Sequence, residues 1–321
     1  TLDFIRHASP SIRKNTPAKR ESAECRGSPI MKVPAIIRAM RPKQWTKNGF
    51  VLAALIFDGK LFDLPLAAAA LVVMLGFCLI SSSVYILNDL VDIEKDRLHP
   101  RKRLRPLPSG RLSPAFAKWS AVLLAVVSIL VTGLISVWAG AIVASYLILN
   151  VWYSFRLKNL VIIDVMMIAG FFVLRVVAGV VAVDVSNFSP WLYVCVSLLA
   201  LFLGFGKRRH EFALLEESAA SHRASLAHYN LPLLDQILGI VTTSGLLAYT
   251  LYTFEAKTAL AQDSHMLLTV PFILYAAFRY LYLIHVEKRG GAPEDLLFED
   301  RPFLLSVLLW GVSVVGVIYL W

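Results

Sequence analysis

Long apolar runs alternate with short polar connections along most of this chain. A membrane-spanning helix needs about 20 apolar residues, and nine stretches approach that length. They cover residues 34–57, 64–88, 113–134, 137–155, 161–183, 190–206, 233–254, 266–285 and 302–321. Strands of a transmembrane barrel alternate apolar and polar residues, whereas the stretch 119–139 is apolar on every side. We therefore predict an all-α, multi-pass membrane protein with about nine transmembrane helices.

Composition supports this prediction. Of the 321 residues, 57% are hydrophobic and 17% are charged, whereas soluble proteins are about 45 to 50% apolar. Residues 1–30 differ, because they are polar and lack the apolar core of a signal peptide. We predict a disordered N-terminal extension over residues 1–30 and a single transmembrane domain over residues 31–321.

Basic residues predict the orientation in the membrane. The formal net charge is +10, and the bases gather in the connections after the second, fourth, sixth and eighth predicted helices. The intervening connections contain only Lys60 and Lys257. Because Lys and Arg accumulate in short cytoplasmic loops, nine helices with a cytoplasmic N-terminus would place every basic connection in the cytoplasm. We expect a plasma (inner) membrane protein with its polar cavity and active site facing the cytoplasm.

Three aspartates follow the second predicted helix. If that helix continues through Asp96, then Asp89, Asp92 and Asp96 lie at i, i+3 and i+7 on one face. Converging carboxylates are hard oxygen ligands of the kind that Mg²⁺ binds, together with water and substrate phosphates. The alternative is that they are solvated acids paired with nearby bases, namely Lys95, Arg97 or Arg101.

A basic segment comes directly after these aspartates. Lys102, Arg103 and Arg105 lie within residues 99–106, which Pro100 and Pro106 stiffen. An Arg guanidinium can bind two phosphate oxygens at once, and a Lys ammonium acts as a point charge. A metal ion neutralises the charge on a leaving diphosphate. Topogenic charge, or attraction to anionic lipid headgroups, would explain these bases but not the neighbouring acids.

The pattern Asn88-Asp89-x-x-Asp92-x-x-x-Asp96 resembles the first aspartate-rich motif of the UbiA superfamily of intramembrane prenyltransferases, whose members have nine helices and a cavity open to the bilayer. The extension over residues 99–106 is similar to one branch of that superfamily. That branch transfers a phosphoribosyl group from phosphoribosyl diphosphate to a polyprenyl (decaprenyl-type) phosphate for cell-wall arabinan synthesis. The resemblance covers about residues 33–321.

The resemblance also implies site residues. Asp89, Asp92 and Asp96 would be catalytic and would bind Mg²⁺ as the cofactor. Substrate-binding residues come from this motif, from the basic segment, and from further matches over residues 41–48, 153–158 and 206–211. They are Lys47, Asn88, Lys102, Arg103, Arg105, Tyr153, Lys158, Lys207, Arg208 and Glu211.

The connection after the sixth predicted helix departs from the prenyltransferases. They carry a second aspartate-rich motif there, whereas this chain has Lys207 and Arg208 ahead of Glu211. A basic connection suits the 5-phosphate of phosphoribosyl diphosphate better than a second metal cluster does. The alternative is an i, i+3 ion pair between Arg208 and Glu211 at a helix end.

Two charged residues lie inside the fifth predicted helix. Asp164 and Arg175 are eleven positions apart, which puts them on one face but about 16 Å distant along the axis. Because charge inside a bilayer is costly, each should face a polar cavity or find a partner, and direct pairing between them is not expected. Arg175 has a structural alternative, in which it binds neighbouring carbonyl groups.

Two other classes of function stay open. A prenyltransferase would use the same aspartates on a prenyl diphosphate, with an aromatic or lipid acceptor. A transporter of anionic lipids or metabolites would place polar groups near the bilayer midplane, whereas these charges gather at one face. Cys25, Cys78 and Cys195 show no zinc or disulfide spacing. We expect membrane lipids but no nucleic acid as partners, and leave homo-oligomerisation open.

Overall fold

The computed structural model describes residues 34–100, 102–185, 189–215, 226, 228–255, 264–289 and 293–320. Within these ranges the chain forms helices and their connections, and contains no strand. The expected all-α, multi-pass membrane fold is therefore confirmed. The expected N-terminal extension, residues 1–30, lies outside the described residues.

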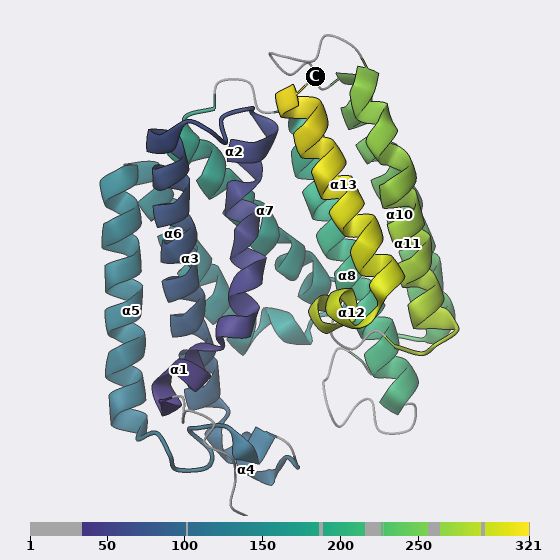
Figure 1. Ribbon diagram of the computed structural model, residues 1–321. Coiled ribbons are helices and arrows are strands. Elements are labelled where there is room, and N and C mark those ends of the chain that lie inside the picture. Colours follow the sequence, from purple (N-terminus) through teal and green to yellow (C-terminus); the bar gives the residue numbers. More distant parts are fainter. Residues whose placement is uncertain are drawn as a thin grey trace, which may run out of the picture. The chain divides into compact units, whose positions relative to one another are not determined.

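Eight helices of the described chain are long and apolar enough to cross a membrane (Figure 1). They are α3 (Leu64–Val91), α5 (Pro114–Ile135), α6 (Val137–Phe155), α7 (Ile163–Val183), α8 (Pro190–Leu215), α10 (Leu231–Glu255), α11 (Val270–His285) with η5 (Ser264–Thr269) before it, and α13 (Arg301–Leu320). Each coincides with a predicted apolar run.

The first apolar run is not one continuous helix, so the predicted number of nine is not confirmed. Residues 34–57 form three short pieces, namely α1 (Ala35–Met40), η1 (Pro42–Leu52) and α2 (Ala53–Phe57). The break falls at Arg41, whose φ is 55°, and Pro42 follows it without a backbone N–H to donate. This broken segment brings polar residues to the centre of the helix assembly.

Local capping explains where two of the long helices begin. The Asp63 carboxylate accepts a hydrogen bond from the N–H of Leu66 at the start of α3. The Ser113 hydroxyl does the same for Phe116 at the start of α5. In both helices a proline stands in the first turn, where no hydrogen-bond donor is needed.

Small residues allow the helices to approach closely. A Cβ added at Gly179 of α7 would lie 2.0 Å from the carbonyl oxygen of Val51, so η1 rests directly on α7. A Cβ at Gly204 of α8 would lie 2.6 Å from a Val165 methyl group on α7. Because lipid is as apolar as the helix surfaces, such close packing is a main source of helix association in membranes.

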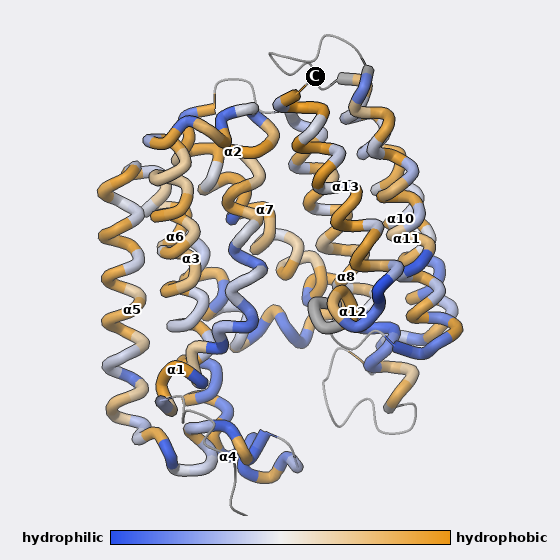
Figure 2. Tube along the Cα trace, in the orientation of Figure 1, coloured by the Kyte–Doolittle hydropathy of each residue, from blue (hydrophilic) through white to orange (hydrophobic). Residues whose placement is uncertain are grey.

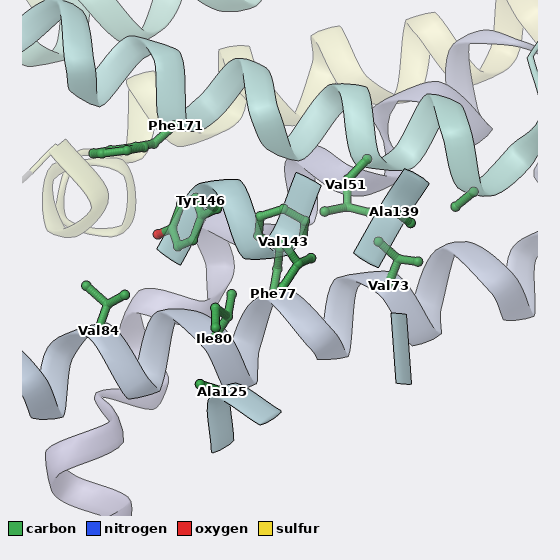
Figure 3. Close-up of a cluster of buried hydrophobic side chains, with 12 residues drawn as sticks. Val51, Val73, Phe77, Ile80, Val84, Ala125, Ala139, Val143, Tyr146 and Phe171 are labelled. Carbon is green, nitrogen blue, oxygen red and sulfur yellow. The ribbon is translucent and has the colours of Figure 1, made fainter. Parts of the chain in front are cut away.

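A buried apolar cluster connects five of these elements, α3, α5, α6, α7 and η1. Figure 3 shows Phe77 of α3, Val143 and Tyr146 of α6, Val51 of η1 and Phe171 of α7 meeting in it. The Tyr146 ring packs edge-on against both Phe77 and Phe171, with centroids 5.4 Å apart in each pair. The cluster holds the broken first segment against the long helices.

Polar residues gather toward the end of the helices where α4 (Ile93–Leu98) and α12 (Pro293–Glu299) lie (Figure 2). The last turns of α3, α6, α8 and α11, after which the basic connections follow, all lie at that end, because successive long helices run in opposite directions. A hollow of about 500 Å³ lies elsewhere, between α11 and α13, and its lining contains no charged residue. The expected polar cavity stays a prediction.

Candidate functional site

Two buried aspartates meet at the end of α3. Asp89 is 2% exposed and Asp96, in α4, is 3% exposed. The helix predicted to continue through Asp96 is instead interrupted at Asp92, but the two carboxylates still converge, because Arg105 Nη1 lies 3.2 Å from Asp89 Oδ1 and 2.7 Å from Asp96 Oδ2. Arg41 Nη2 lies 2.5 Å from the same Asp89 oxygen. Buried carboxylates require such partners. Together with Lys102, these residues are called the α3 cluster below.

Two separate segments supply the cations of the α3 cluster. Arg41 reaches it from the kink between α1 and η1, and its guanidinium lies 4.9 Å from the centre of the Tyr85 ring. Arg105 and Lys102 come from the turn around η2 (Lys102–Leu104), where Lys102 Nζ lies 3.9 Å from Asp96 Oδ1. Arg97 instead pairs with Glu94, at 2.7 Å. Asp89 and Asp96 therefore do pair with bases, as the alternative expected, but these bases lie further along the chain than Lys95 or Arg97. The third expected partner, Arg101, lies outside the described residues.

Asp92 occupies the bend between α3 and α4. Its φ of −97° and ψ of 12° interrupt the helix, and within the described chain its carboxylate has no ion pair. No three acidic, His or Cys side chains of that part of the chain gather closely enough to hold a metal ion. Mg²⁺ commonly takes one or two protein carboxylates and completes its shell with water and substrate phosphates. Asp89 and Asp96, whose oxygens converge on one nitrogen, fit that donor set.

A second charged group lies at the end of α8. Arg208 is 3% exposed, and its Nε donates to Asp164 Oδ2 at 2.9 Å while Nη1 donates to Glu211. Lys207 is far more exposed, with Nζ 4.0 Å from Glu211 Oε1. The Tyr229 hydroxyl donates to Asp164 Oδ1 at 3.1 Å. We call Asp164, Lys207, Arg208, Glu211 and Tyr229 the α8 cluster.

These ion pairs extend α8 beyond its predicted end at residue 206. The helix continues to Leu215, because the charged side chains after residue 206 form ion pairs: Lys207 and Arg208 both contact Glu211. The i, i+3 pair between Arg208 and Glu211, which the sequence offered as an alternative, is present. It leaves Lys207 as the more accessible cation of the α8 cluster.

The end of α6 contacts α3 beside the α3 cluster. The Ser154 hydroxyl donates to Asn88 Oδ1 at 2.6 Å, which ties α6 to the residue before Asp89. The ring of the neighbouring Tyr153 packs edge-on against Phe171 of α7, with centroids 5.8 Å apart. Two consecutive residues of α6 are therefore held against α3 and α7.

The remaining predicted substrate ligands lie on segments that adjoin the two clusters. Lys47 is half-buried in η1, and Lys158 is half-buried in η3 (Leu157–Asn159). Arg103 is exposed in η2. Their roles stay predictions.

Asp164 and Arg175 do not pair with each other, as expected from their separation. Arg175 Nε donates to Asn48 Oδ1 at 2.8 Å and Nη1 donates to the carbonyl of Phe171 at 2.7 Å. Nη2 donates to the Tyr146 hydroxyl at 2.9 Å. Each nitrogen of the guanidinium thus donates a hydrogen bond inside the fold, one of them to a carbonyl group, as the structural alternative for Arg175 expects.

Sequence reasoning missed three site residues. Arg41 belongs to a matched motif, but no spacing connects it with Asp89, 48 positions later. The sequence shows Asp164 as a charge inside a predicted helix, but it does not identify Arg208 as the partner of that charge. Tyr229 carries no signal in the sequence, since one tyrosine beside an apolar helix is typical of a membrane interface.

Comparison with known proteins gives concordant results. The model of the UbiA prenyltransferase family matches residues 49–308. Decaprenyl-phosphate phosphoribosyltransferase of Mycolicibacterium smegmatis is 32% identical over 316 residues, which cover 95% of this chain and 98% of that protein. The protein of the same name from Corynebacterium glutamicum is 31% identical over 291 residues, covering 89% of this chain and 87% of that protein.

Solved structures agree on the fold. A UbiA homolog from Archaeoglobus fulgidus bound to GPP and Mg²⁺ superposes with a TM-score of 0.67 at 18% identity, covering 88% of this chain and 99% of that one. The same homolog bound to Cd²⁺ gives a TM-score of 0.64 at 17% identity, with coverage of 88% and 99%.

Proposed function

This chain belongs to the UbiA prenyltransferase family, and on that premise we propose that it transfers a 5-phosphoribosyl group from phosphoribosyl diphosphate to a polyprenyl phosphate of the decaprenyl type. The product is a lipid-linked ribose phosphate of the kind used for cell-wall arabinan. The relatives that cover nearly the whole chain are named for this acceptor and this type of transfer.

The basic end of α8 carries the assignment of the donor. Phosphoribosyl diphosphate bears a 5-phosphate in addition to its diphosphate, so its site needs cations in two places. The α3 cluster supplies one group, Arg41, Lys102 and Arg105. Lys207, beside Glu211, supplies a cation in the α8 cluster, and a prenyl diphosphate would have no second phosphate to bind there.

Substrate positioning and charge stabilisation account for the chemistry. An oxygen of the acceptor phosphate forms the new bond to the anomeric carbon of ribose, while the bond from that carbon to the diphosphate breaks and the diphosphate leaves with the electron pair. The attacking oxygen is already anionic, so a strong general base is not required. Arg105 and Lys102 stabilise the charge that develops on the leaving group.

Asp89, Asp92 and Asp96 would hold Mg²⁺, which when bound offsets further negative charge on the diphosphate. Arg105, which contacts both carboxylates, would also contact the donor. Asn88, which accepts from Ser154, and Glu211, which accepts from Arg208, would position ribose hydroxyls. Tyr153, in the last turn of α6, Lys158, in η3, and Lys47, in η1, would complete the substrate-binding residues.

A radiolabel transfer assay on the purified protein tests this function. Labelled phosphoribosyl diphosphate, a decaprenyl-type phosphate and Mg²⁺ should yield label in the lipid phase, and EDTA should stop the transfer until Mg²⁺ is restored. A parallel reaction contains a prenyl diphosphate and an aromatic acid. Prenylated aromatic product would overturn the donor assignment, and the absence of transfer in both reactions would overturn the enzymatic assignment in favour of transport.

A further inference from the structure

The connection into α7 contains a strained turn. Ile162 has φ 68° and ψ −51°, and the N–H of Ile163 donates to the carbonyl of Val161 at 2.7 Å. This is a γ-turn with positive φ, which is rare and strained. A β-branched residue is a poor occupant of such a conformation. Strained backbone persists where surrounding contacts hold it, and such positions cluster at functional sites.

One side chain holds this turn and also reaches the α8 cluster. The N–H of Ile162 donates to the Tyr229 hydroxyl at 2.6 Å, and that hydroxyl donates in turn to Asp164 Oδ1 at 3.1 Å. Tyr229 is 4% exposed and Asp164 is fully buried. Burial raises the pKa of Tyr229 to about 12, so the hydroxyl keeps its proton and donates to Asp164 throughout the range of ordinary assays.

From Asp164 the contacts continue to the accessible part of the α8 cluster. The carboxylate of Asp164 binds Arg208, which is itself buried and binds Glu211. Glu211 is the neighbour of Lys207. Arg208 therefore acts on the accessible part of the α8 cluster by holding Glu211, because its Nε already binds Asp164 and its Nη1 already binds Glu211. The same turn adjoins η3, the segment that carries Lys158.

We propose that Tyr229 and Asp164 are positioning residues for the donor: through the buried hydrogen-bonded chain from the Ile162 turn to Arg208, they fix the place of Glu211 and Lys207. The proposal rests on the proposed function, because it assigns this end of α8 to the donor phosphate. It also reassigns Arg208 from a direct phosphate ligand to a positioning residue.

Tyr229→Phe is the informative variant, because it keeps the ring and removes only the hydroxyl. Tyr249→Phe is its matched control. Tyr249 is 7% exposed, and its hydroxyl lies 2.6 Å from Thr269 Oγ1 and accepts from Trp310 Nε1 at 2.7 Å, away from both clusters. Each substitution therefore removes a buried, hydrogen-bonded phenolic hydroxyl.

Two measurements separate positioning from a merely structural role. The first is KM for each substrate: Tyr229→Phe should raise the donor KM about tenfold, as expected for weakened hydrogen bonds to charged groups, and leave the acceptor KM unchanged. The second is hydrogen–deuterium exchange, in which the Ile162 amide should exchange faster in that variant. Tyr249→Phe should change neither, although both variants lower the melting temperature.

Failure of the proposal is distinguishable from failure of the proposed function. A donor KM that is unchanged in Tyr229→Phe, or raised equally with the acceptor KM, overturns the positioning role, whatever happens to amide exchange. If the wild-type protein transfers a prenyl group instead, the proposed function fails. The KM values of Tyr229→Phe for the prenyl donor and for its acceptor then decide whether Tyr229 acts on donor binding, because only the donor KM should rise.

Discussion

Arg105 shows at the scale of single residues how the α3 cluster is held together. One nitrogen of its guanidinium contacts carboxylates seven positions apart in the chain, and both carboxylates are almost fully buried. Burying charge costs free energy that close pairing must recover. Removing Asp89 would leave Arg41 without its carboxylate partner, and removing Asp96 would take from Arg105 the shorter of its two contacts. A loss of activity in either variant would therefore mix catalysis with folding.

Asp92 offers a cleaner test, because its carboxylate has no ion pair within the described chain. Asp92→Asn should reduce transfer by at least about 100-fold, in the range seen when a charge-stabilising group is removed, with no loss of melting temperature in detergent. Activity and thermal unfolding of the same preparation provide the measurement.

Glu94→Gln is the control for Asp92→Asn. Glu94 lies two positions further along, in α4, carries the same charge and has a side chain that is 81% exposed. It should retain full activity. Equal activity of the two variants would contradict a metal-binding role for Asp92.

At the scale of elements, the contact between η1 and α7 decides where Arg41 lies. The polar Asn48 of η1 binds Arg175 of α7, and the backbone of η1 at Val51 rests on Gly179. Arg41, at the beginning of the same element, pairs with Asp89. Close packing at one end of η1 thus supports an ion pair of the site at the other.

Gly179→Ala should disturb both ends of η1. The added Cβ would lie 2.0 Å from the Val51 carbonyl oxygen, and backbone cannot move aside as a flexible side chain can. We expect a loss of about 1 to 3 kcal/mol in unfolding free energy, as for other overpacked sites, together with a fall in transfer activity. Thermal unfolding and the transfer assay measure the two effects.

Gly170→Ala is the control on the same helix. A Cβ at Gly170 meets no atom within 4 Å, and alanine has a higher helix propensity than glycine. Stability should be equal or slightly higher. If Gly179→Ala were as stable and active as Gly170→Ala, η1 would not depend on its contact with α7.

At the scale of the whole molecule, charge is distributed unequally between the two ends of the long helices. The described bases of four connections lie at the end that also contains the α3 and α8 clusters, whereas Lys60 lies at the opposite end. Because positive charge is retained in the cytoplasm during insertion, we expect the site to face the cytoplasm.

Substituted cysteines can test that orientation. In a protein without Cys25, Cys78 and Cys195, Arg111→Cys should react with a membrane-impermeant maleimide in inside-out vesicles only. Lys60→Cys should react in right-side-out vesicles only. The reverse pattern would place the active site outside the cytoplasm.

Sequence alone determined the class of fold and most helix positions. Spanning length and helix capping are local properties, so seven of the long helices begin within about two residues of the predicted starts, and α3 and α5 begin at their capping residues. The aspartate spacing also predicted that the carboxylates converge, and Asp89 and Asp96 do so although the helix is interrupted at Asp92. The family could be recognised from motifs because these too are local.

Tertiary structure decided which groups meet. Asp89 pairs with Arg41, Arg208 pairs with Asp164, and Arg175 binds Asn48, over separations of 48, 44 and 127 positions. Sequence shows that a buried charge needs a partner, but several partners of equal chemistry exist along the chain. Helix packing selects among them, because it determines which side chains come within hydrogen-bonding distance. The same packing broke the first apolar run at Arg41 and tied Tyr229 to the start of α7.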